Sequence, residues 1–185
     1  MIYYGAKELA ESFRTVRKNT MQIAEEIPED KYGFRPAPDT RTVAQLLTHI
    51  ALGYKFQHQV HAKERRTTLE GFDFPALMQR LGAEEQQPRT KQQIQQLLRS
   101  NGEEWAGWLT GLSDDFLRER VAMPAGMSQP AKSRFEMILS VKEHEMHHRG
   151  QLMLIERMLG VVPHLTRERD ERVRQRRAPA QAVKQ

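Results

Sequence analysis

The stretch EHEMHHRGQ, residues 143–151, lies in the middle of a long amphipathic segment and places two histidines four residues apart. Residues at positions i and i+4 lie on one face of a helix, so His144 and His148 can chelate a single ion. A two-histidine pair binds a transition metal weakly and needs at least one more ligand from elsewhere in the fold. His49, which lies in another helical segment, is the natural third ligand.

This stretch belongs to one of four segments that show the apolar spacing of amphipathic helices and lack strand-like alternation. Pro28 closes the first segment, a proline-rich entry precedes the second, and Gly160 is placed as the stop of the last. The expected helices cover residues 6–27, 40–62, 90–112 and 131–159. Four helices of this length predict an all-α protein with a four-helix bundle.

Two longer connections interrupt this pattern. Residues 67–89 contain two glycines and two prolines, and within them residues 74–81 predict a short extra helix that lies over the bundle. Ser113 offers a cap for a short turn, and residues 121–130 form a second loop. We expect these two connections to line a pocket, although neither carries a recognisable ligand motif.

Length and charge predict one domain with a tail. The chain has 185 residues, which suits a bundle domain over residues 1–162 followed by a basic tail over residues 163–185, either helical or disordered. The stretch 165–185 holds six arginines and one lysine against three acids, so it carries +4 of the net charge of +5. A basic face on the bundle is therefore not expected, and nucleic-acid contacts are expected at most from the tail.

Composition also narrows the kinds of chemistry and the location. The chain has no cysteine, which excludes disulfides, a thiolate nucleophile and cysteine-ligated zinc, and leaves histidine and carboxylate as the strong metal ligands. It has no run of about 18 apolar residues and no secretory signal at its start. We expect a cytoplasmic protein without membrane contacts.

The other histidines offer alternatives to this triad. His147 is the rival partner of His144, because positions i and i+3 also share a side of a helix, but His148 continues the apolar line from Val141 to Ile155. A histidine on an apolar face is also commonly a hydrogen-bonded core residue without a metal. The remaining three histidines lie at segment ends and are expected to be exposed: His58, His61 and His164.

Three stretches together resemble the DinB-like (DinB/YfiT) superfamily of small bacterial four-helix proteins. One resembles the family's link between its first two helices, the next resembles the helix with its first metal histidine, and the third matches its final-helix H-x-x-x-H signature. These stretches are residues 27–36, 42–50 and 144–152. The likeness covers about residues 1–162 and does not extend to the basic tail.

The resemblance implies His49, His144 and His148 as metal ligands, in agreement with the spacing argument. It further implies an up-down-down-up bundle, a homodimer, and a bound divalent ion with open water positions. Nickel and zinc are the first candidates, and manganese, iron and copper remain possible because such a site discriminates poorly among them. A low-molecular-weight thiol is an implied cosubstrate.

Two functional hypotheses follow. The first is a metal-dependent enzyme that acts on an unidentified small molecule, as a thiol S-transferase or a hydrolase, since three protein ligands leave a position for water or substrate. The second is a non-catalytic stress or interaction protein in which the metal ties two helices together. Glu143 and Glu145 are interpreted as solvent-facing rather than catalytic, and Arg149 and Gln151 as polar contacts between helices.

Overall fold

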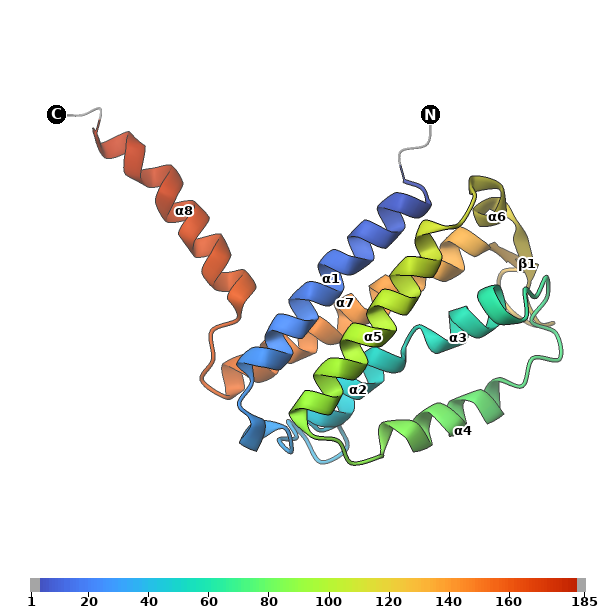
Figure 1. The fold of residues 1–185 in the computed structure, drawn as a ribbon, viewed down its shortest axis with the longest axis horizontal. Helices are drawn as coiled ribbons and strands as arrows, with labels where there is room; N and C mark the ends of the chain where they lie inside the picture. Colours follow the sequence, from blue (N-terminus) through green and yellow to red (C-terminus); the bar gives the residue numbers. More distant parts are fainter. Residues whose placement is uncertain (1–3, 183–185) are drawn as a thin grey trace.

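The structure, a computed structural model, describes residues 4–182, with side chains as far as residue 176. Helices dominate it, and Figure 1 shows their arrangement. In chain order the elements are α1 (Ala6–Glu26), the 3₁₀ turn η1 (Glu29–Lys31), α2 (Val43–Leu52), α3 (Lys55–His58), the π-helical turn η2 (Gln59–Lys63), α4 (Phe74–Glu85), α5 (Lys91–Thr110), α6 (Asp114–Arg118), β1 (Arg120–Ala122), β2 (Ala131–Ser133), α7 (Arg134–Met158) and α8 (His164–Ala182). Among these residues, no helix combines the length and apolar character needed to cross a membrane.

Side-chain caps define where the main helices begin. Thr42 accepts a hydrogen bond from the Gln45 backbone N–H, and the Gln45 side chain accepts one from the Thr42 backbone N–H, so a capping box opens α2. Thr90 and Gln93 form the same arrangement at the start of α5. Ser133 caps α7 through the backbone N–H of Glu136. Each cap satisfies a backbone donor that the helix leaves without a partner and contributes about 1 kcal/mol.

Helices α1, α2, α5 and α7 form the four-helix bundle, and α3 extends the line of α2. Figure 1 shows α1 and α7 running in one direction and α2 and α5 running in the other, which is the predicted up-down-down-up order. Two consecutive bundle helices can be parallel only if the chain returns between them. Helix α4 makes that return over the outside of α2, as the short helix expected within residues 67–89.

Two large apolar clusters are stacked along the bundle, and a third, smaller cluster lies at the hairpin. One cluster lies toward the α1–α2 connection and includes Ile23, Leu47, Ile94, Leu98 and Leu152, all buried. The other lies toward the opposite end and is built around Phe13, Tyr54, Trp105, Leu109 and Ile138. Burial of each of these side chains stabilises the fold by roughly 1.5–3 kcal/mol before the cost of ordering is subtracted.

A buried ion pair joins the two clusters. The Arg17 guanidinium on α1 donates to both carboxylate oxygens of Glu145 on α7, at 2.9–3.1 Å. It also donates to the Leu98 carbonyl on α5 and, at 3.4 Å, to the Ile50 carbonyl on α2. Glu145 is only 1% exposed, so its interpretation as a solvent-facing residue is wrong. Its charge is tolerated because Arg17 neutralises it and its oxygens are hydrogen-bonded.

Two expectations about elements need correction. The helix expected over residues 40–62 starts at its Thr42 cap and is interrupted at Gly53, where the backbone N–H bonds to the Ile50 carbonyl three residues back. The loop expected over residues 121–130 connects the strands of a short antiparallel hairpin, β1 with β2, in which Val121 pairs with Lys132. Val121 is fully buried against Val60 and Met137, and this contact favours a strand over an irregular loop.

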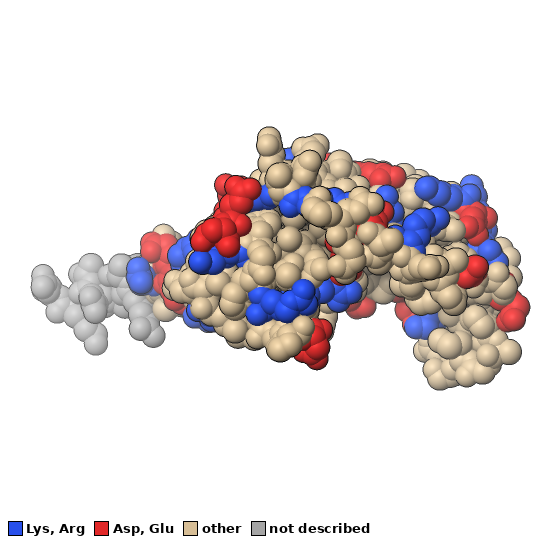
Figure 2. All heavy atoms as spheres, turned by 90° about the horizontal axis from the view of Figure 1, so that it is seen from below, with Lys and Arg blue, Asp and Glu red and all other residues tan. Residues whose placement is uncertain are grey.

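Within the described part of the tail, residues 164–182 form α8, which Figure 1 shows extending away from the bundle. Its first turn is attached to the body. His164 is 1% exposed, and Arg167 donates to the Glu26 carboxylate at the end of α1 at 2.6 Å. On the face shown in Figure 2, basic and acidic side chains are interspersed, in keeping with the near-neutral charge expected for the body.

Candidate metal centre

Helices α2 and α7 position the three predicted histidines. His49 lies on the last turn of α2, and His144 and His148 lie one turn apart in the middle of α7. Gly53, one turn after His49, allows the close approach of the two helices. A Cβ atom at Gly53 would lie 2.8 Å from Nδ1 of His144, closer than any packed contact allows. The missing side chain therefore makes room for the His144 ring.

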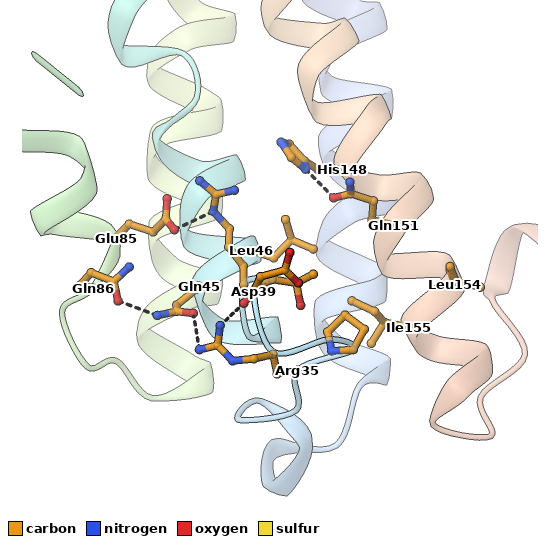
Figure 3. Close-up of a pocket in the computed structure, with 13 residues that line it drawn as sticks. Arg35, Asp39, Gln45, Leu46, Glu85, Gln86, His148, Gln151, Leu154 and Ile155 are labelled. Carbon is orange, nitrogen blue, oxygen red and sulfur yellow. Dashed lines mark hydrogen bonds and ion pairs between the residues drawn. The ribbon is translucent and has the colours of Figure 1, made fainter. Parts of the chain in front are cut away.

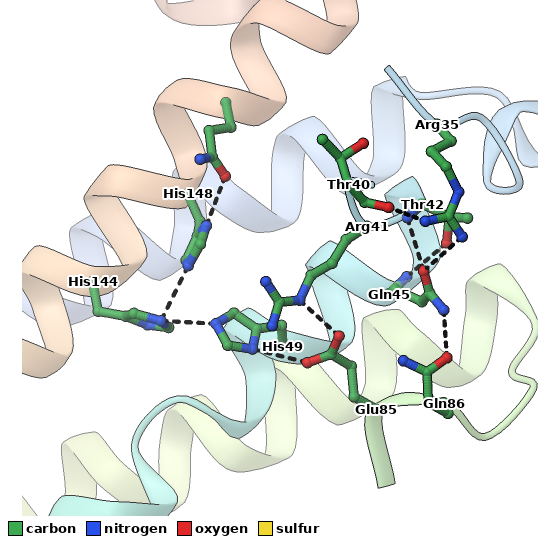
Figure 4. A network of polar contacts seen from close by, with 11 residues as sticks. Arg35, Thr40, Arg41, Thr42, Gln45, His49, Glu85, Gln86, His144 and His148 are labelled. Atoms are coloured by element: carbon green, nitrogen blue, oxygen red, sulfur yellow. Dashed lines mark hydrogen bonds and ion pairs between the residues drawn. The ribbon is translucent and has the colours of Figure 1, made fainter. Parts of the chain in front are cut away.

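The three imidazoles meet through the same ring atom. Nε2 of His144 lies 2.9 Å from Nε2 of His49 and 3.1 Å from Nε2 of His148 (Figure 4). The ligand atoms of all three residues lie within 4.8 Å of one another. Three nitrogen atoms at 2.0–2.1 Å from one ion, in mutually perpendicular directions, are about 3 Å apart. The two distances from His144 match that value, and an ion held by these three residues would have room for other ligands.

The outer ring nitrogens of two of these histidines have their own partners. Nδ1 of His49 donates to Oε2 of Glu85 at 2.9 Å, and Nδ1 of His148 donates to Oε1 of Gln151 at 2.7 Å. These hydrogen bonds place the proton of each neutral ring on Nδ1 and leave a lone pair on Nε2. A proton on Nε2 of His144 can satisfy only one of those two lone pairs. A cation satisfies all three nitrogens, so the donor set fits a metal.

Burial favours the neutral imidazoles that metal binding requires. Burial, followed by the charges of His148 and His49, lowers the pKa of His144 to about 4. Burial also lowers the pKa of His148, although the hydrogen bond to Gln151 opposes this. Burial alone would raise the pKa of Glu85, but the hydrogen bonds from His49 and Arg41 outweigh it and hold that pKa below its ordinary value. At neutral pH the site therefore combines neutral His144 and His148 rings with an ionised Glu85.

Two cavities meet at the three histidines. The larger, about 700 Å³, has a mixed polar and apolar lining; Figure 3 shows Arg35, Gln45 and Gln86 on one side of it and His148 and Gln151 on the other. The smaller, about 400 Å³, is mostly apolar and lies between α4 and the α2–α3 segment, with His49 and His144 in its wall. Residues 67–89 contribute to both cavities through α4, as expected. Residues 121–130 line neither, and the segment from Arg35 to Gln45 takes the place expected for them.

The residues of α7 next to His144 and His148 differ in exposure and in their hydrogen bonds. His147 is exposed and its ring accepts a hydrogen bond from the Gln151 amide at 3.3 Å, so it lies outside the triad. Glu143 is exposed as expected. Gln151 was expected to make a contact between helices, but it bonds only to His147 and His148 of its own helix among the residues described. The structure assigns it to orientation of His148.

The expectation that the remaining three histidines are exposed is wrong for all of them. His61 is 1% exposed, because the π-helical turn η2 directs it into the body, where its Nδ1 accepts a hydrogen bond from Arg134 at 2.8 Å. Burial, and then the charge of Arg134, lowers the pKa of His61 to about 3. His164 is buried where α8 begins, and His58 is half-buried beside Trp105.

Sequence reasoning missed Glu85, which is 8% exposed and accepts hydrogen bonds from both His49 and Arg41. Its signal is present in the spacing of α4. Phe74, Met78, Leu81 and Glu85 recur every three or four residues and so share one helix face. The contact itself joins residues 36 positions apart and depends on how the return helix is laid over α2.

A four-helix bundle with three inward-facing histidines on its second and last helices defines a class of candidate metal-binding proteins. Residues 12–152 match the DinB superfamily, and the chain belongs to that family.

The relatives found agree in fold. The chain is 23% identical over 155 residues to the uncharacterized protein YjoA of Bacillus subtilis, which covers 84% of this chain and 91% of that protein. The crystal structure of YjoA, described as a DinB-like protein, superposes with a TM-score of 0.60 at 20% identity and covers 83% of this chain and 92% of YjoA. At this identity the likeness supports the fold alone.

Proposed function

We propose that this protein binds one divalent transition metal through His49, His144 and His148 and acts as a metal-dependent enzyme on small molecules, of thiol S-transferase or hydrolase type. The observation that carries the proposal is the convergence of three Nε2 atoms beside two cavities. A structural metal site is closed by protein ligands, whereas three ligands leave a position for a substrate.

The chain's own residues prepare this site. Glu85 and Gln151 fix the orientation of His49 and His148 through their Nδ1 hydrogen bonds. Arg41 holds Glu85 in place at 2.7 Å. A divalent ion bound there would lower the pKa of a water molecule or of a small thiol, which is the chemistry that both reaction types need. We propose nickel or zinc as the ion, since imidazole ligands suit both.

Metal analysis of three proteins tests the binding. The wild-type protein, His148→Ala and His147→Ala are purified identically, and nickel, zinc, manganese, iron and copper are measured per chain. We expect about one ion per chain in the wild type and in the exposed control His147→Ala, and less than a tenth of that in His148→Ala. Equal metal content in the two variants would contradict the proposed ligand set.

Turnover is tested with the metal-loaded protein. A panel of small thiols is combined with electrophiles, and a panel of esters and amides is assayed in parallel. Activity that is present in His147→Ala and lost in His148→Ala supports an enzyme and separates the two reaction types. No turnover above the His148→Ala background, in protein shown to hold the metal, counts against catalysis.

A non-catalytic role is the alternative, and the origin of the histidines on two helices favours it as a second candidate, because a metal there ties α2 to α7. When the free ion concentration is 100 times its Kd, binding raises the free energy of unfolding by about 2.7 kcal/mol. A purely structural role predicts that chelation lowers the free energy of unfolding by this amount, that the metal-loaded protein turns over no substrate, and that no small ligand binds at the open position of the metal. A small ligand that binds the metal-loaded protein and not the metal-free protein favours the open site.

A further inference from the structure

The smaller cavity changes character along its length. Phe74, Met78 and Leu81 form one face of α4, and the next residue on that face is Glu85. Leu52, Gly53 and Phe56 form the opposite wall, and this wall ends at His49 and His144. The cavity is therefore apolar at the Phe74 end and charged at the three histidines.

The charged end offers donors for an anion. Arg41 uses Nε to bind Glu85, and among the described residues neither of its two terminal nitrogens has a hydrogen-bond partner. Figure 4 shows its guanidinium beside His49, and Arg41 lines both cavities. Both oxygens of Glu85 are already occupied, by Arg41 and by His49. A guanidinium with available N–H groups recognises a carboxylate by paired hydrogen bonds.

The apolar end is walled by rings and a thioether and is open to solvent. The Phe56 ring packs edge-on against Phe72 and Phe74, with centroids 5.5 and 5.4 Å apart. Phe74 remains 47% exposed and Met78 37% exposed, which is high for large apolar side chains that line a cavity. A ligand body that covers them gains the free energy of removing this apolar surface from water.

We propose that this cavity binds a small amphipathic carboxylate, with the carboxylate on Arg41 beside the three histidines and an apolar body along the Phe74–Met78–Leu81 face of α4. The proposal rests on the proposed function, since it names the substrate class of the same site. The volume of the smaller cavity, about 400 Å³, lies within the range of small-molecule pockets. A bound divalent ion adds positive charge at the same end and favours an anion further.

Calorimetric titration with ligands of graded length tests this proposal. Zinc-loaded and metal-free protein are each titrated with butanoate, hexanoate, octanoate and octan-1-ol. We expect affinity to rise about three- to fourfold for each added CH₂ group until the pocket is filled, the value expected for burial of one methylene. Octanoate should bind more tightly than octan-1-ol, because only the carboxylate pairs with Arg41.

Variants assign the two ends. Arg41→Gln is expected to weaken octanoate at least tenfold, the loss of a charged hydrogen bond, and to leave octan-1-ol unchanged. Met78→Glu should abolish the dependence of carboxylate affinity on chain length. Met127→Glu is the matched control, because Met127 is 57% exposed and lies outside the cavity. Phe74→Ala, a mild change at an exposed position, replaces Met78→Glu if circular dichroism shows that the latter does not fold.

The proposal would be overturned if affinity did not depend on chain length, or if Arg41→Gln lost equal affinity for octanoate and octan-1-ol. It would also be overturned if Met127→Glu changed the affinities as much as Met78→Glu. A dimer that Met78→Glu separates, with no octanoate binding, would assign the cavity to a second copy of the chain and also overturn it. Octanoate binding that depends on chain length, in a wild-type protein that takes up no metal in the metal analysis, would support this inference and contradict the proposed function. Metal binding without octanoate binding would support the proposed metal site and contradict this inference.

Discussion

At the scale of single residues, Gly53 is decisive because the His144 ring occupies the space of its missing side chain. Gly53→Ala adds a Cβ atom 2.8 Å from Nδ1 of His144, so the ring must leave the position in which it meets His49. We predict that this variant weakens metal binding at least tenfold, measured by competition with a chromophoric chelator. Gly150→Ala is the control, since nothing lies within 4 Å of a Cβ there; it should bind metal normally and be more stable by about 0.5–1 kcal/mol.

Glu85 allows a second prediction at this scale. Its carboxylate fixes the Nδ1 proton of His49, and removal of such a partner typically costs 10- to 100-fold in metal affinity. Glu85→Ala should show a loss in that range in the same chelator competition, with His144 and His148 still in place. Its neighbour Glu84, which interacts with Arg89, provides the control. If Glu84→Ala weakens binding as much as Glu85→Ala, Glu85 has no special role.

These residues also show what a single sequence can reveal. The spacing of His144 and His148 within one helix, the place of His49 in another helix, and the family resemblance together selected the triad that the structure brings together. Glu145 was misjudged because α7 contacts both α1 and α2, so one apolar stripe does not describe its buried surface. Its burial depends on Arg17, which lies 128 residues away. No periodicity in the sequence reveals such a partner.

At the scale of elements, the junction of α7 with α8 has an unusual acid. Glu156 is fully buried, neither of its oxygens has a hydrogen-bond partner among the described residues, and burial followed by the charge of Glu26 raises its pKa to about 7. The folded chain therefore holds this proton more tightly than the unfolded chain, whose pKa is near 4.5. The contribution to stability is complete below pH 4.5 and is lost as the pH rises to 7.

We predict that Glu156→Gln removes this loss of stability between pH 4.5 and pH 7. The variant should be more stable than the wild type at pH 8, by about 1–2 kcal/mol after allowance for solvent screening, and similar to it at pH 4.5. Urea unfolding at both pH values measures the difference. Glu143→Gln, an exposed position on the same helix, should follow the wild type. A constant offset of Glu156→Gln at the two pH values would refute the assignment.

The elements themselves were predictable to different degrees. The long helices follow from apolar spacing, although α7 starts at Arg134 and not at residue 131 as expected, because residues 131–133 form β2 and Ser133 is the cap. The interruption at Gly53 could not be predicted, because the backbone there stays close to helical. The need for a glycine at this position depends on a ring of another helix. The β1–β2 hairpin was missed because its three-residue strands are too short to show alternation.

At the scale of the whole molecule, we predict a homodimer, as the resemblance to the family implies. The exposed surface near the end of α7 offers an apolar row of Leu154, Met158 and Val162, which are 61%, 52% and 53% exposed. Surface rows of this kind are typical of protein interfaces. Light scattering of the full chain should give twice the mass of one chain, and Leu154→Glu combined with Met158→Glu should halve it. Met127→Glu should not.

A single-chain mass for the wild-type protein at concentrations up to the millimolar range would contradict the dimer. An unchanged dimer mass in the double variant would place the interface elsewhere on the surface.

The return helix α4 has a consequence for how this protein could change over time. It contacts α2 from outside and contributes none of the side chains of the two main core clusters, yet it supplies one wall of the apolar cavity and the carboxylate beside His49. Substitutions at Phe74, Met78 and Leu81 can therefore accumulate without disturbing the packing that keeps the bundle folded. In the proposed function, ligand preference and fold stability are carried by different parts of the chain, so that a new specificity can arise in α4 while the histidines stay fixed.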